Sequence, residues 1–330
     1  MANNDFVKQI VEGIQKQLGS QEEIQLMSSK GINIPRISSG IYALDYILGG
    51  GLPVGKVIEL FGDEGSGKTT VALHAIAKAQ KLGGIAAFID LENGLNIDYA
   101  QTLGVDIDSL MVSQPESGNS AMEVVMKIME QKADIKELES KPLVIVVDSA
   151  AALVTLDEQK GDVGDTQVSP VARLLSTVLR RMVTTVRKTG TILIFTNQMR
   201  DDIGSWYKTS SSTGGRALKF YSTIRIELSI TKKIITPDKV VIGQMVRAKT
   251  VKNRTFPPYK EAELKVIYGQ GVDTIASIVN LAIKHGIVTA KGAFYSYDDI
   301  RIQGDAKFAE ELRKTPALLG KIIKELDDAR

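Results

Sequence analysis

Short apolar runs alternate with helical segments through the middle of the chain. Each run is apolar at consecutive positions, which is typical of strands buried on both faces between two layers of helices. Alternation of strands and helices favours parallel pairing, because parallel neighbours need a crossover between them. The pattern therefore predicts an α/β fold with a mixed, mainly parallel sheet. The four runs cover residues 57–61, 85–90, 143–148 and 191–196.

Three further strand-like runs follow without helices of comparable length between them. Strands that are joined by short connections pair antiparallel, so we expect an antiparallel extension of the sheet. The runs cover residues 222–230, 240–250 and 261–268.

The last part of the chain has a different order of elements. A helix is predicted at residues 274–284, then a short strand pair around Ile287 and at residues 294–297, and two helical stretches after it. We interpret residues 271–330 as a small α+β C-terminal domain.

The first residues carry an apolar stripe. Apolar side chains recur every four residues, which places them on one face of a helix that ends at a glycine. The polar stretch that follows resembles a linker with a short strand at residues 24–27, so we separate residues 1–39 from a core at 40–270. The stripe can pack on its own core or on a neighbouring copy, and periodicity leaves both open. Its residues are Phe6, Ile10, Ile14 and Leu18, followed by Gly19.

Composition narrows the chemistry. A chain of 330 residues suffices for about two domains. With 41 Lys and Arg against 39 Asp and Glu the net charge is only +2, so nucleic-acid binding would rest on local basic segments. There is no cysteine and there are two histidines, which excludes disulfides and Cys/His zinc sites and leaves oxygen ligands for any metal. No apolar run has the length of a membrane span and no signal peptide is evident, which favours a cytoplasmic protein without a membrane partner.

A glycine-rich phosphate-binding loop lies between the first apolar run of the core and a helical segment. It matches G-x-x-x-x-G-K-[ST], in which backbone N–H groups surround phosphate oxygens. Lys68 is expected to reach the β- and γ-phosphates and Thr69 to offer its hydroxyl to Mg²⁺. The pattern predicts binding of a nucleoside triphosphate. The loop comprises Gly62, Asp63, Glu64, Gly65, Ser66, Gly67, Lys68 and Thr69, followed by Thr70.

Polar residues follow three of the other apolar runs, at the sheet edge where open α/β sheets bind their ligands. Asp148 ends its run and is expected to hold Mg²⁺ through water. Glu92 could polarise the attacking water, and Asp90 competes for that role. Asn197 and Gln198 offer neutral amides that suit sensing of a γ-phosphate.

These residues resemble the bacterial RecA family of homologous-recombination ATPases, over nearly the whole chain. Several long segments carry the resemblance in addition to the phosphate loop. They are GDEGSGKTT (62–70), FIDLENGLNIDYA (88–100), VIVVDSAAAL (144–153), LIFTNQMR (193–200), TGGRALKFY (213–221) and VKNRTFPPYKEAELKVIYGQG (251–271).

The resemblance implies a role for each matching position around ATP. Glu92 would be the general base, Gln198 would link the γ-phosphate to a DNA loop, and Tyr99 would stack on adenine. Asn96 stands where many relatives have Asp, at the edge of the base. Lys252 and Arg254 match basic positions that reach the ATP of the adjacent subunit. The implied subunit contacts are Lys219 and Phe220 beside the ATP, and Phe6, Ile10 and Ile14 on a polymerisation helix.

Two segments with loop composition would hold single-stranded DNA, again by resemblance. They cover residues 157–169 and 200–216, and the second would wedge side chains between bases. Arg173, Arg180 and Arg187 share one helix face, and the first two match phosphate-contacting positions. The candidate DNA contacts are Arg173, Ser176, Arg180, Met199, Arg200, Ile203, Trp206, Tyr207, Gly214, Gly215 and Arg216, with Lys284, Lys291, Arg301 and Lys307 for duplex DNA in the C-terminal domain.

The sequence thus predicts an ATP- and Mg²⁺-dependent DNA strand-exchange recombinase. It would polymerise as a helical filament on single-stranded DNA, pair it with homologous duplex and hydrolyse ATP, with single-strand-binding and loader proteins as further candidate partners. A ring helicase or a recombination-associated DNA motor with the same ATPase fold is the alternative. A RadA-like protein is suggested by Lys252-Asn253-Arg254, but the zinc element of that family needs cysteines that this chain lacks.

Overall fold

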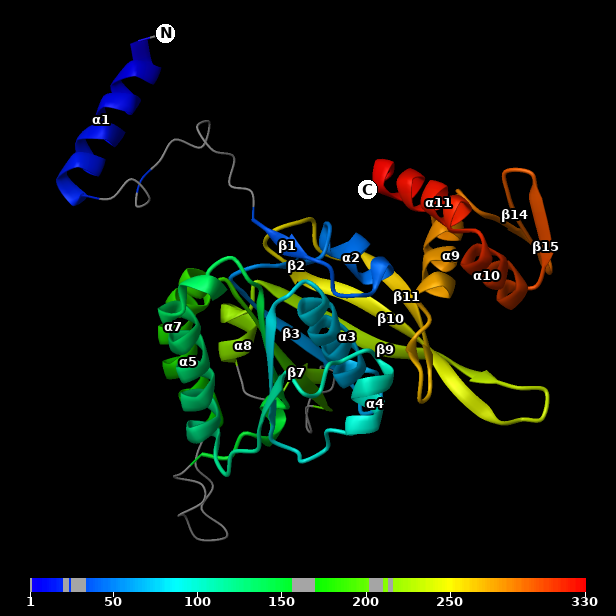
Figure 1. The fold of residues 1–330 in the computed structure, drawn as a ribbon, viewed down its shortest axis with the longest axis horizontal. Helices are drawn as coiled ribbons and strands as arrows, with labels where there is room; N and C mark the ends of the chain where they lie inside the picture. The colour runs from blue at the N-terminus through cyan, green and yellow to red at the C-terminus, as the bar shows by residue number, and fades with distance from the viewer. Residues whose placement is uncertain (1, 20–23, 25–33, 156–169, 202–209, 213–215) are drawn as a thin grey trace. The chain divides into compact units, whose positions relative to one another are not determined.

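The computed structural model describes residues 2–19, 24, 34–155, 170–201, 210–212 and 216–330 (Figure 1). The chain divides into two units, residues 1–35 and 36–330. The first unit contains α1 (Ala2–Leu18), on which the apolar side chains of Phe6 and Ile10 are exposed. The amphipathic helix is thus confirmed. Of the strand expected at 24–27 only Ile24 is described, in a bend, and its carbonyl accepts a hydrogen bond from the Gln15 side chain.

The second unit is built on a large mixed sheet. Within the described residues the sheet has ten strands, of which β8 (Ser210–Ser212) pairs only with β7. In spatial order the other nine are β12 (Gly271–Val272), β11 (Glu261–Ile267), β10 (Val241–Asn253), β9 (Ile224–Ile235), β3 (Lys56–Gly62), β7 (Thr191–Asp201), β6 (Leu143–Asp148), β4 (Ile85–Asp90) and β5 (Leu110–Ser113).

The strands from β9 to β5 pair parallel, and those from β9 to β12 pair antiparallel. A mainly parallel sheet with an antiparallel extension is therefore confirmed. The first strand of this extension, β9, also pairs with β3, and that pairing is parallel. The crossover through the preceding loop and helix returns the chain to the same end of the sheet, which the short apolar run alone does not reveal.

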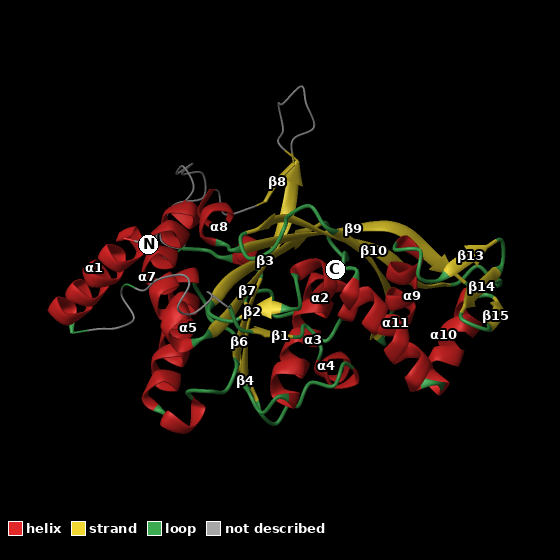
Figure 2. Cartoon of the chain, turned by 90° about the horizontal axis from the view of Figure 1, so that it is seen from above, coloured by secondary structure: helices red, strands yellow, loops and turns green. Residues whose placement is uncertain are grey.

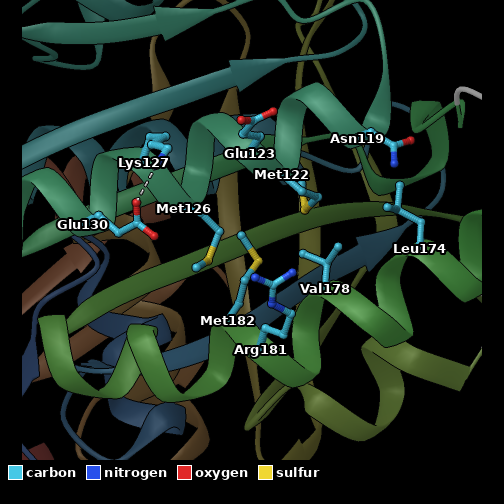
Figure 3. A pocket seen from close by; sticks show the side chains of 10 residues that line it. All are labelled: Asn119, Met122, Glu123, Met126, Lys127, Glu130, Leu174, Val178, Arg181 and Met182. Atoms are coloured by element: carbon cyan, nitrogen blue, oxygen red, sulfur yellow. Dashed lines mark hydrogen bonds and ion pairs between the residues drawn. The ribbon is translucent and has the colours of Figure 1, made fainter.

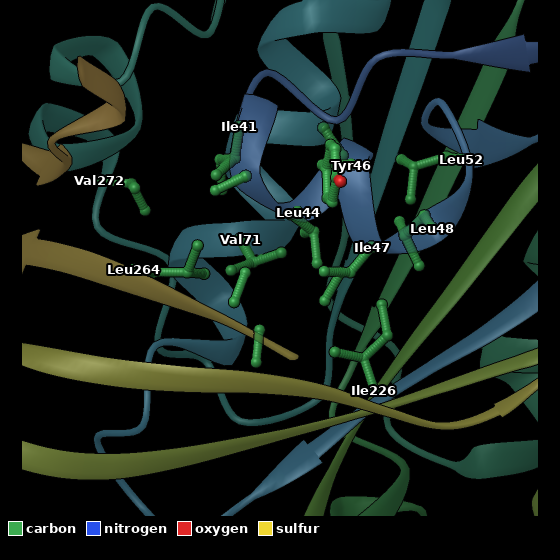
Figure 4. Packing of buried hydrophobic residues seen from close by; sticks show 14 of the residues in the cluster. Ile41, Leu44, Tyr46, Ile47, Leu48, Leu52, Val71, Ile226, Leu264 and Val272 are labelled. Atoms are coloured by element: carbon green, nitrogen blue, oxygen red, sulfur yellow. The ribbon is translucent and has the colours of Figure 1, made fainter. Parts of the chain in front are cut away.

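Helices cover both faces of the sheet. Residues of β6 alternate between two apolar clusters: Val144 and Val146 belong to one, and Leu143, Ile145 and Val147 belong to the other. This alternation explains why the strands are apolar at consecutive positions. The first cluster, part of which is drawn in Figure 4, includes residues of α2 (Tyr42–Leu48) and α3 (Lys68–Lys81), and the second includes residues of α5 (Gly118–Asp134) and α7 (Pro170–Thr189).

Several short elements complete the core and were not expected from the sequence. They contain too few residues for a periodic pattern. These are β1 (Arg36–Ile37) and β2 (Leu52–Pro53), which form a separate pair, α4 (Ile97–Thr102), α8 (Arg216–Tyr221), and the 3₁₀ turns η1 (Lys136–Leu138) and η2 (Ala150–Ala152). No described helix is long and apolar enough to cross a membrane.

The C-terminal region has the expected α+β composition but one more strand than expected. Its elements are α9 (Thr274–Lys284), β13 (Thr289–Lys291), β14 (Phe294–Tyr297), β15 (Ile300–Gln303), α10 (Asp305–Lys314) and α11 (Pro316–Asp328). The sheet has three strands, and Ile287 lies before the first of them. The apolar cluster of α2 and α3 continues through α9 and α10, so this region shares the core. The boundary at residue 271 stays a prediction.

A histidine joins α3 to the start of β12. The His74 Nε2 atom accepts a hydrogen bond from the backbone N–H of Val272 at 3.2 Å. Burial lowers the pKa of His74 from 6.5 to about 4, and the charge of Lys81 acts in the same direction. The folded protein therefore holds this ring neutral.

We expect His74 to make stability fall in mild acid. Because its pKa is lower in the folded state, its contribution is complete above pH 6.5 and is lost as the pH falls towards 4, by about 2–3 kcal/mol. His74→Gln keeps an acceptor for Val272 without a titrating ring, so its urea midpoint should depend less on pH. His285→Gln, at an exposed histidine, is the control. Equal pH dependence of wild type and His74→Gln would contradict the assignment.

Candidate nucleotide-binding site

The phosphate loop joins the carboxyl end of β3 to the start of α3. Gly62 packs so closely on β9 that a Cβ atom there would lie 2.1 Å from the carbonyl oxygen of Leu228. Gly67 has φ 89° and precedes the first residue of α3, where a left-handed backbone favours glycine. Both glycines of the sequence motif are therefore required by geometry. The first turn of α3 points its N–H groups at the loop, which suits an anion.

Lys68 is held above this loop. Its Nζ atom donates hydrogen bonds to the carbonyl oxygens of Gly62 at 3.0 Å and Asp63 at 2.7 Å. Burial lowers the pKa of Lys68, and the negative charges of nearby acidic residues, of which Asp148 and Glu92 have the largest effect, oppose this shift. The ammonium group is thus kept among oxygen acceptors where phosphate oxygens would lie.

Oxygen atoms of three elements converge beside Lys68. The hydroxyl of Thr69 donates to Asp148 Oδ2 at 2.6 Å, and the hydroxyl of Thr196 donates to Oδ1 at 2.5 Å. Burial raises the pKa of Asp148, so the carboxylate would gain from a nearby cation. One carboxylate and one hydroxyl fit Mg²⁺, which takes most of its other ligands from phosphates and water. Among the described residues there is no group of three or more acidic or histidine side chains that could hold a metal ion.

Glu92 and Asp90 have different environments. Asp90 is 2% exposed and accepts hydrogen bonds from the backbone N–H groups of Gly94 and Leu95, at 3.1 and 3.2 Å, and from Gln114. Its carboxylate therefore holds the loop after β4. Glu92 is exposed, and one of its oxygens accepts a hydrogen bond from Ser149.

A cavity of about 460 Å³ opens beside the phosphate loop. Tyr99 lines it, and the Tyr99 hydroxyl lies 2.9 Å from that of Thr70. Asn96 also lines it, with its Oδ1 atom accepting the N–H of Tyr99 at the start of α4. The loop residues that line the cavity are Gly65, Gly67, Lys68, Thr69 and Thr70.

The far wall of this cavity was not predicted from the sequence. The buried side chain of Gln244 on β10 donates to the carbonyl oxygen of Gly65 at 2.6 Å and accepts from the Tyr268 hydroxyl at 3.0 Å. A neutral amide in a long strand carries no motif, and its contact with Gly65 joins segments 179 residues apart. Val266, Tyr268 and Gly269 complete this wall.

The predicted sensor lies on β7, and the predicted trans-acting residue Lys252 lies on β10, with β3 and β9 between these two strands. The N–H of Gln198 on β7 donates to the Asn197 side chain at 2.9 Å. Lys252 on β10 donates from Nζ to the carbonyl oxygens of Lys219 at 2.6 Å and Phe220 at 3.1 Å, at the end of α8. Phe220 is 63% exposed. The described lining residues of the nucleotide cavity include neither Lys252 nor the exposed Arg254.

The candidate DNA-binding residues are described only in part. On α7, Arg173, Arg180 and Arg187 are exposed, as a shared face predicts, and Ser176 is half-buried. Met199 and Arg200 lie on β7 where it pairs with β8 and projects from the sheet (Figure 2), and Arg216 begins α8. Ile203, Trp206, Tyr207, Gly214, Gly215 and the segment 157–169 lie outside the described residues.

The basic candidates of the C-terminal region are exposed, but two of them have partners within the protein. Lys284 donates to the carbonyl oxygen of Glu261 at 3.0 Å. The Arg301 guanidinium lies over the Phe294 ring at 4.6 Å. Lys291 and Lys307 are exposed.

A second cavity, between α5 and α7, has a different character. It measures about 330 Å³ and is lined by Met122, Met126 and Met182, with the ion pair Lys127–Glu130 at its rim (Figure 3). None of its described lining residues belongs to the nucleotide site.

A phosphate loop at the carboxyl edge of a parallel sheet, with a lysine, a hydroxyl and an acidic residue around it, defines a nucleotide-binding protein of the phosphate-loop α/β class. The family model of the RecA N-terminal domain matches residues 5–273, and that of the RecA C-terminal domain matches residues 276–329. The chain belongs to the RecA family.

Individual relatives agree with the family models. The chain is similar to Protein RecA of Chloroherpeton thalassium, with 42% identity over 322 residues that cover 96% of this chain and 87% of the relative. It is similar to Protein RecA of Thermus thermophilus, with 41% identity over 315 residues, 94% of this chain and 90% of the relative. The protein is accordingly an ATP-binding RecA-type recombinase and a DNA-dependent ATPase that acts in oligomeric filaments, and the ring-helicase and DNA-motor alternatives are not favoured.

We expect Gln244→Ala to weaken ATP binding, because it frees the Gly65 carbonyl and removes one wall of the cavity. Loss of one hydrogen bond of about 0.5–1.5 kcal/mol corresponds to a roughly 2- to 12-fold higher Kd, measured with a fluorescent ATP analogue. Tyr268→Phe keeps the ring and the contact between Gln244 and Gly65, and should change the Kd less. An unchanged Kd in Gln244→Ala would show that the loop holds its shape without this contact.

Proposed function

We propose that this recombinase hydrolyses ATP with Lys68, Thr69, Asp148 and Glu92 as the central groups. The observation that carries the proposal is their convergence at the carboxyl edge of β3, β6 and β4. Lys68 would exchange its two loop carbonyls for β- and γ-phosphate oxygens, and Thr69 and Asp148 would hold Mg²⁺. When bound, Mg²⁺ would neutralise charge on the phosphates. Tyr99 and Asn96 would contact the base.

Glu92 is proposed as the general base. Its carboxylate is exposed at the sheet edge, whereas that of Asp90 is buried and accepts three hydrogen bonds from its own loop and Gln114. Ser149 would orient Glu92 through the hydrogen bond to one of its oxygens, and the second oxygen could take the proton of the attacking water.

We expect Glu92→Gln to bind ATP normally and to hydrolyse it at least about 100-fold more slowly in single turnover, because the amide cannot accept the proton. Asp90→Asn should instead lower the thermal midpoint, because its amide repels one of the loop N–H groups, and should retain more activity. Near wild-type hydrolysis by Glu92→Gln would sink the base assignment.

Lys252 and Arg254 are proposed to act on the ATP of a neighbouring subunit. Neither residue is among the described residues that line the cavity of its own subunit, and Lys252 binds the carbonyl oxygen of the exposed Phe220, which supports a role at an interface. Lys219 and Phe220 would belong to the same contact. Positive charge there would stabilise charge that develops on the transferred phosphoryl group.

The filament contact is proposed to involve α1 of one subunit and the α5 side of the next. Phe6 and Ile10 are 62% and 59% exposed, and Ile14 is half-buried. A groove of about 570 Å³ runs along α5 and the edge strand β5, with a predominantly apolar lining that includes Met111, Val124, Ile128, Ile135 and Leu138. An apolar stripe and an apolar groove at different places on one chain form a head-to-tail interface, which generates a filament.

We expect subunit mixing to restore activity. Lys68→Ala and Lys252→Ala should each abolish ATPase alone, but a mixture should recover part of it where a wild-type phosphate loop meets a wild-type Lys252. Adding Ile10→Asp to both variants should abolish the recovery, because the subunits would no longer assemble. Absence of recovery in mixtures shown by crosslinking to co-assemble would count against the shared site.

DNA contact is proposed for the exposed face of α7 and for the second loop, including Met199, Arg200 and Arg216. The seven-residue spacing of Arg173 and Arg180 suits a row of phosphates, and the loop residues outside the described part would supply the wedges. Homologous duplex as the second substrate, and single-strand-binding and loader proteins as partners, stay predictions.

For Arg173→Ala or Arg180→Ala we expect the slope of log K against log salt for single-stranded DNA to become shallower by about 0.7. When one phosphate contact is lost, binding of the protein releases fewer counterions from the DNA. Arg187→Ala, at the opposite end of α7 from the loop, is the matched control and should keep the wild-type slope. Unchanged slopes for Arg173→Ala and Arg180→Ala would mean that this face is only solvated.

A further inference from the structure

A buried ionic cluster crosses the middle of the sheet. Glu59 on β3 is fully buried. One of its oxygens accepts a hydrogen bond from the Asn197 side chain on β7 at 2.9 Å, and the other is ion-paired with Arg225 on β9. The Arg225 guanidinium also lies over the ring of Phe61 at 4.5 Å. A carboxylate in the centre of an otherwise apolar strand is therefore bound on both sides.

The cluster lies between the two halves of the proposed catalytic machinery. At one side, Asn197 accepts the N–H of Gln198, the proposed γ-phosphate sensor, at 2.9 Å. At the other side, Arg225 is the cross-strand neighbour of Lys252, the proposed trans-acting residue. Asn197 and Gln198 lie on β7, Glu59 on β3, Arg225 on β9 and Lys252 on β10, and these four strands are consecutive in the sheet. From Gln198 to Arg225 each residue contacts the next directly, and Arg225 and Lys252 are cross-strand neighbours.

Charge connects the cluster to Lys252. Burial and the positive charges of Arg254 and Arg225 together lower the pKa of Lys252 to about 8, and the negative charge of Glu59 opposes this shift. Glu59 thus offsets the repulsion between Arg225 and Lys252. The Lys252 ammonium group in turn holds the end of α8 through two backbone carbonyls.

Stability alone is a weak reason for such a cluster. A buried ion pair gains little over apolar residues of similar volume, because both charges lose their hydration. The position of Glu59 between Gln198 and Lys252 gives it a more specific use.

We propose that Glu59 is a positioning residue that holds Gln198 and Lys252 of one subunit in a common arrangement, through Asn197 on one side and Arg225 on the other. The subunit then presents its sensor to its own ATP and its lysine to the ATP of its neighbour as one unit. This inference rests on the proposed roles of Gln198 and Lys252.

The test uses Glu59→Gln in the full chain with single-stranded DNA. ATPase turnover should fall at least about 10-fold while the Kd for ATP stays within about 2-fold of wild type, because the phosphate loop itself is unchanged. In Glu59→Gln both half-sites are disturbed: Gln198, which faces the ATP of its own subunit, and Lys252, which faces the ATP of the neighbour. Mixing the variant with Lys68→Ala should therefore not restore turnover, and neither should mixing it with Lys252→Ala.

The mixture of Lys68→Ala with Lys252→Ala is the positive control. If the control recovers activity and Glu59→Gln is restored by one of the two partners, only one half-site depends on Glu59 and the inference is overturned. If the control mixture recovers no activity in co-assembled filaments, the proposal of an ATP site shared between subunits is wrong. The inference about Glu59 is then wrong as well, because it rests on that proposal. The two failures are therefore distinguishable.

A second readout separates positioning from a loss of folding. In Glu59→Gln the charge of Arg225 is no longer offset, so the alkaline limb of the ATPase profile should move to lower pH. In Glu59→Gln/Arg225→Gln, which leaves no buried charge unpaired, the limb should return to or above the wild-type pH, while neither mixture restores turnover. The charged groups that act on Lys252 are Arg254, Arg225 and Glu59. An alkaline limb that is unchanged in both variants overturns the proposal, even if Glu59→Gln is less stable.

Discussion

The double pairing of β3 is the constraint on which the rest of the structure depends. β3 hydrogen-bonds in parallel with β7 on one side and β9 on the other, so the backbone of β9 lies close against its carboxyl end. Gly62 meets the Leu228 carbonyl there, and the chain must turn away into the phosphate loop. Because β7 runs parallel beside β3, its polar end emerges at the same edge as the loop. A strand between two parallel neighbours thus sets the place where phosphate and polar side chains meet.

At that edge of the sheet, charged side chains form hydrogen bonds with other groups of the protein. Lys68 is bound by loop carbonyls, Asp148 by two hydroxyls, and Glu92 by Ser149. Each of these is a charge-assisted hydrogen bond that a nucleotide or cation can replace by one of similar strength. Substrate binding then exchanges partners instead of ordering free side chains, which lowers its entropic cost.

The proposed division of the site between subunits agrees with the order of the strands. Lys252 lies two strands away from β3, on β10, and its ammonium group binds the end of α8 near the exposed Phe220. A group in that position can serve the ATP of another subunit more readily than its own. The buried carboxylate of Glu59 lies between β10 and β7 in the strand order and contacts the strands on either side of its own.

Local patterns were sufficient to predict the longer strands of the core, the phosphate loop, the amphipathic α1 and the roles proposed for strand-end residues, but not the short strands β1, β2 and β5. Each depends on neighbours within a few residues: apolar periodicity reports which faces are buried, and a strand, glycine loop and helix form one continuous segment. The polar ends of β4, β6 and β7 were predictable because parallel strands meet at one edge. The resemblance to the RecA family added roles that periodicity could not supply.

Other features were decided only by tertiary structure. Gln244 reaches Gly65 across 179 residues, and Asn197 and Arg225 reach Glu59 across 138 and 166 residues. The choice between Glu92 and Asp90 depends on which carboxylate the folded loop surrounds with N–H groups, and the direction of β9 depends on where the chain re-enters the sheet. A single amide or carboxylate in a strand has the same local sequence whether it faces solvent or a distant partner. Its role is set by the packing of strands that are remote in sequence, because hydrogen bonds and burial act through space and not along the chain.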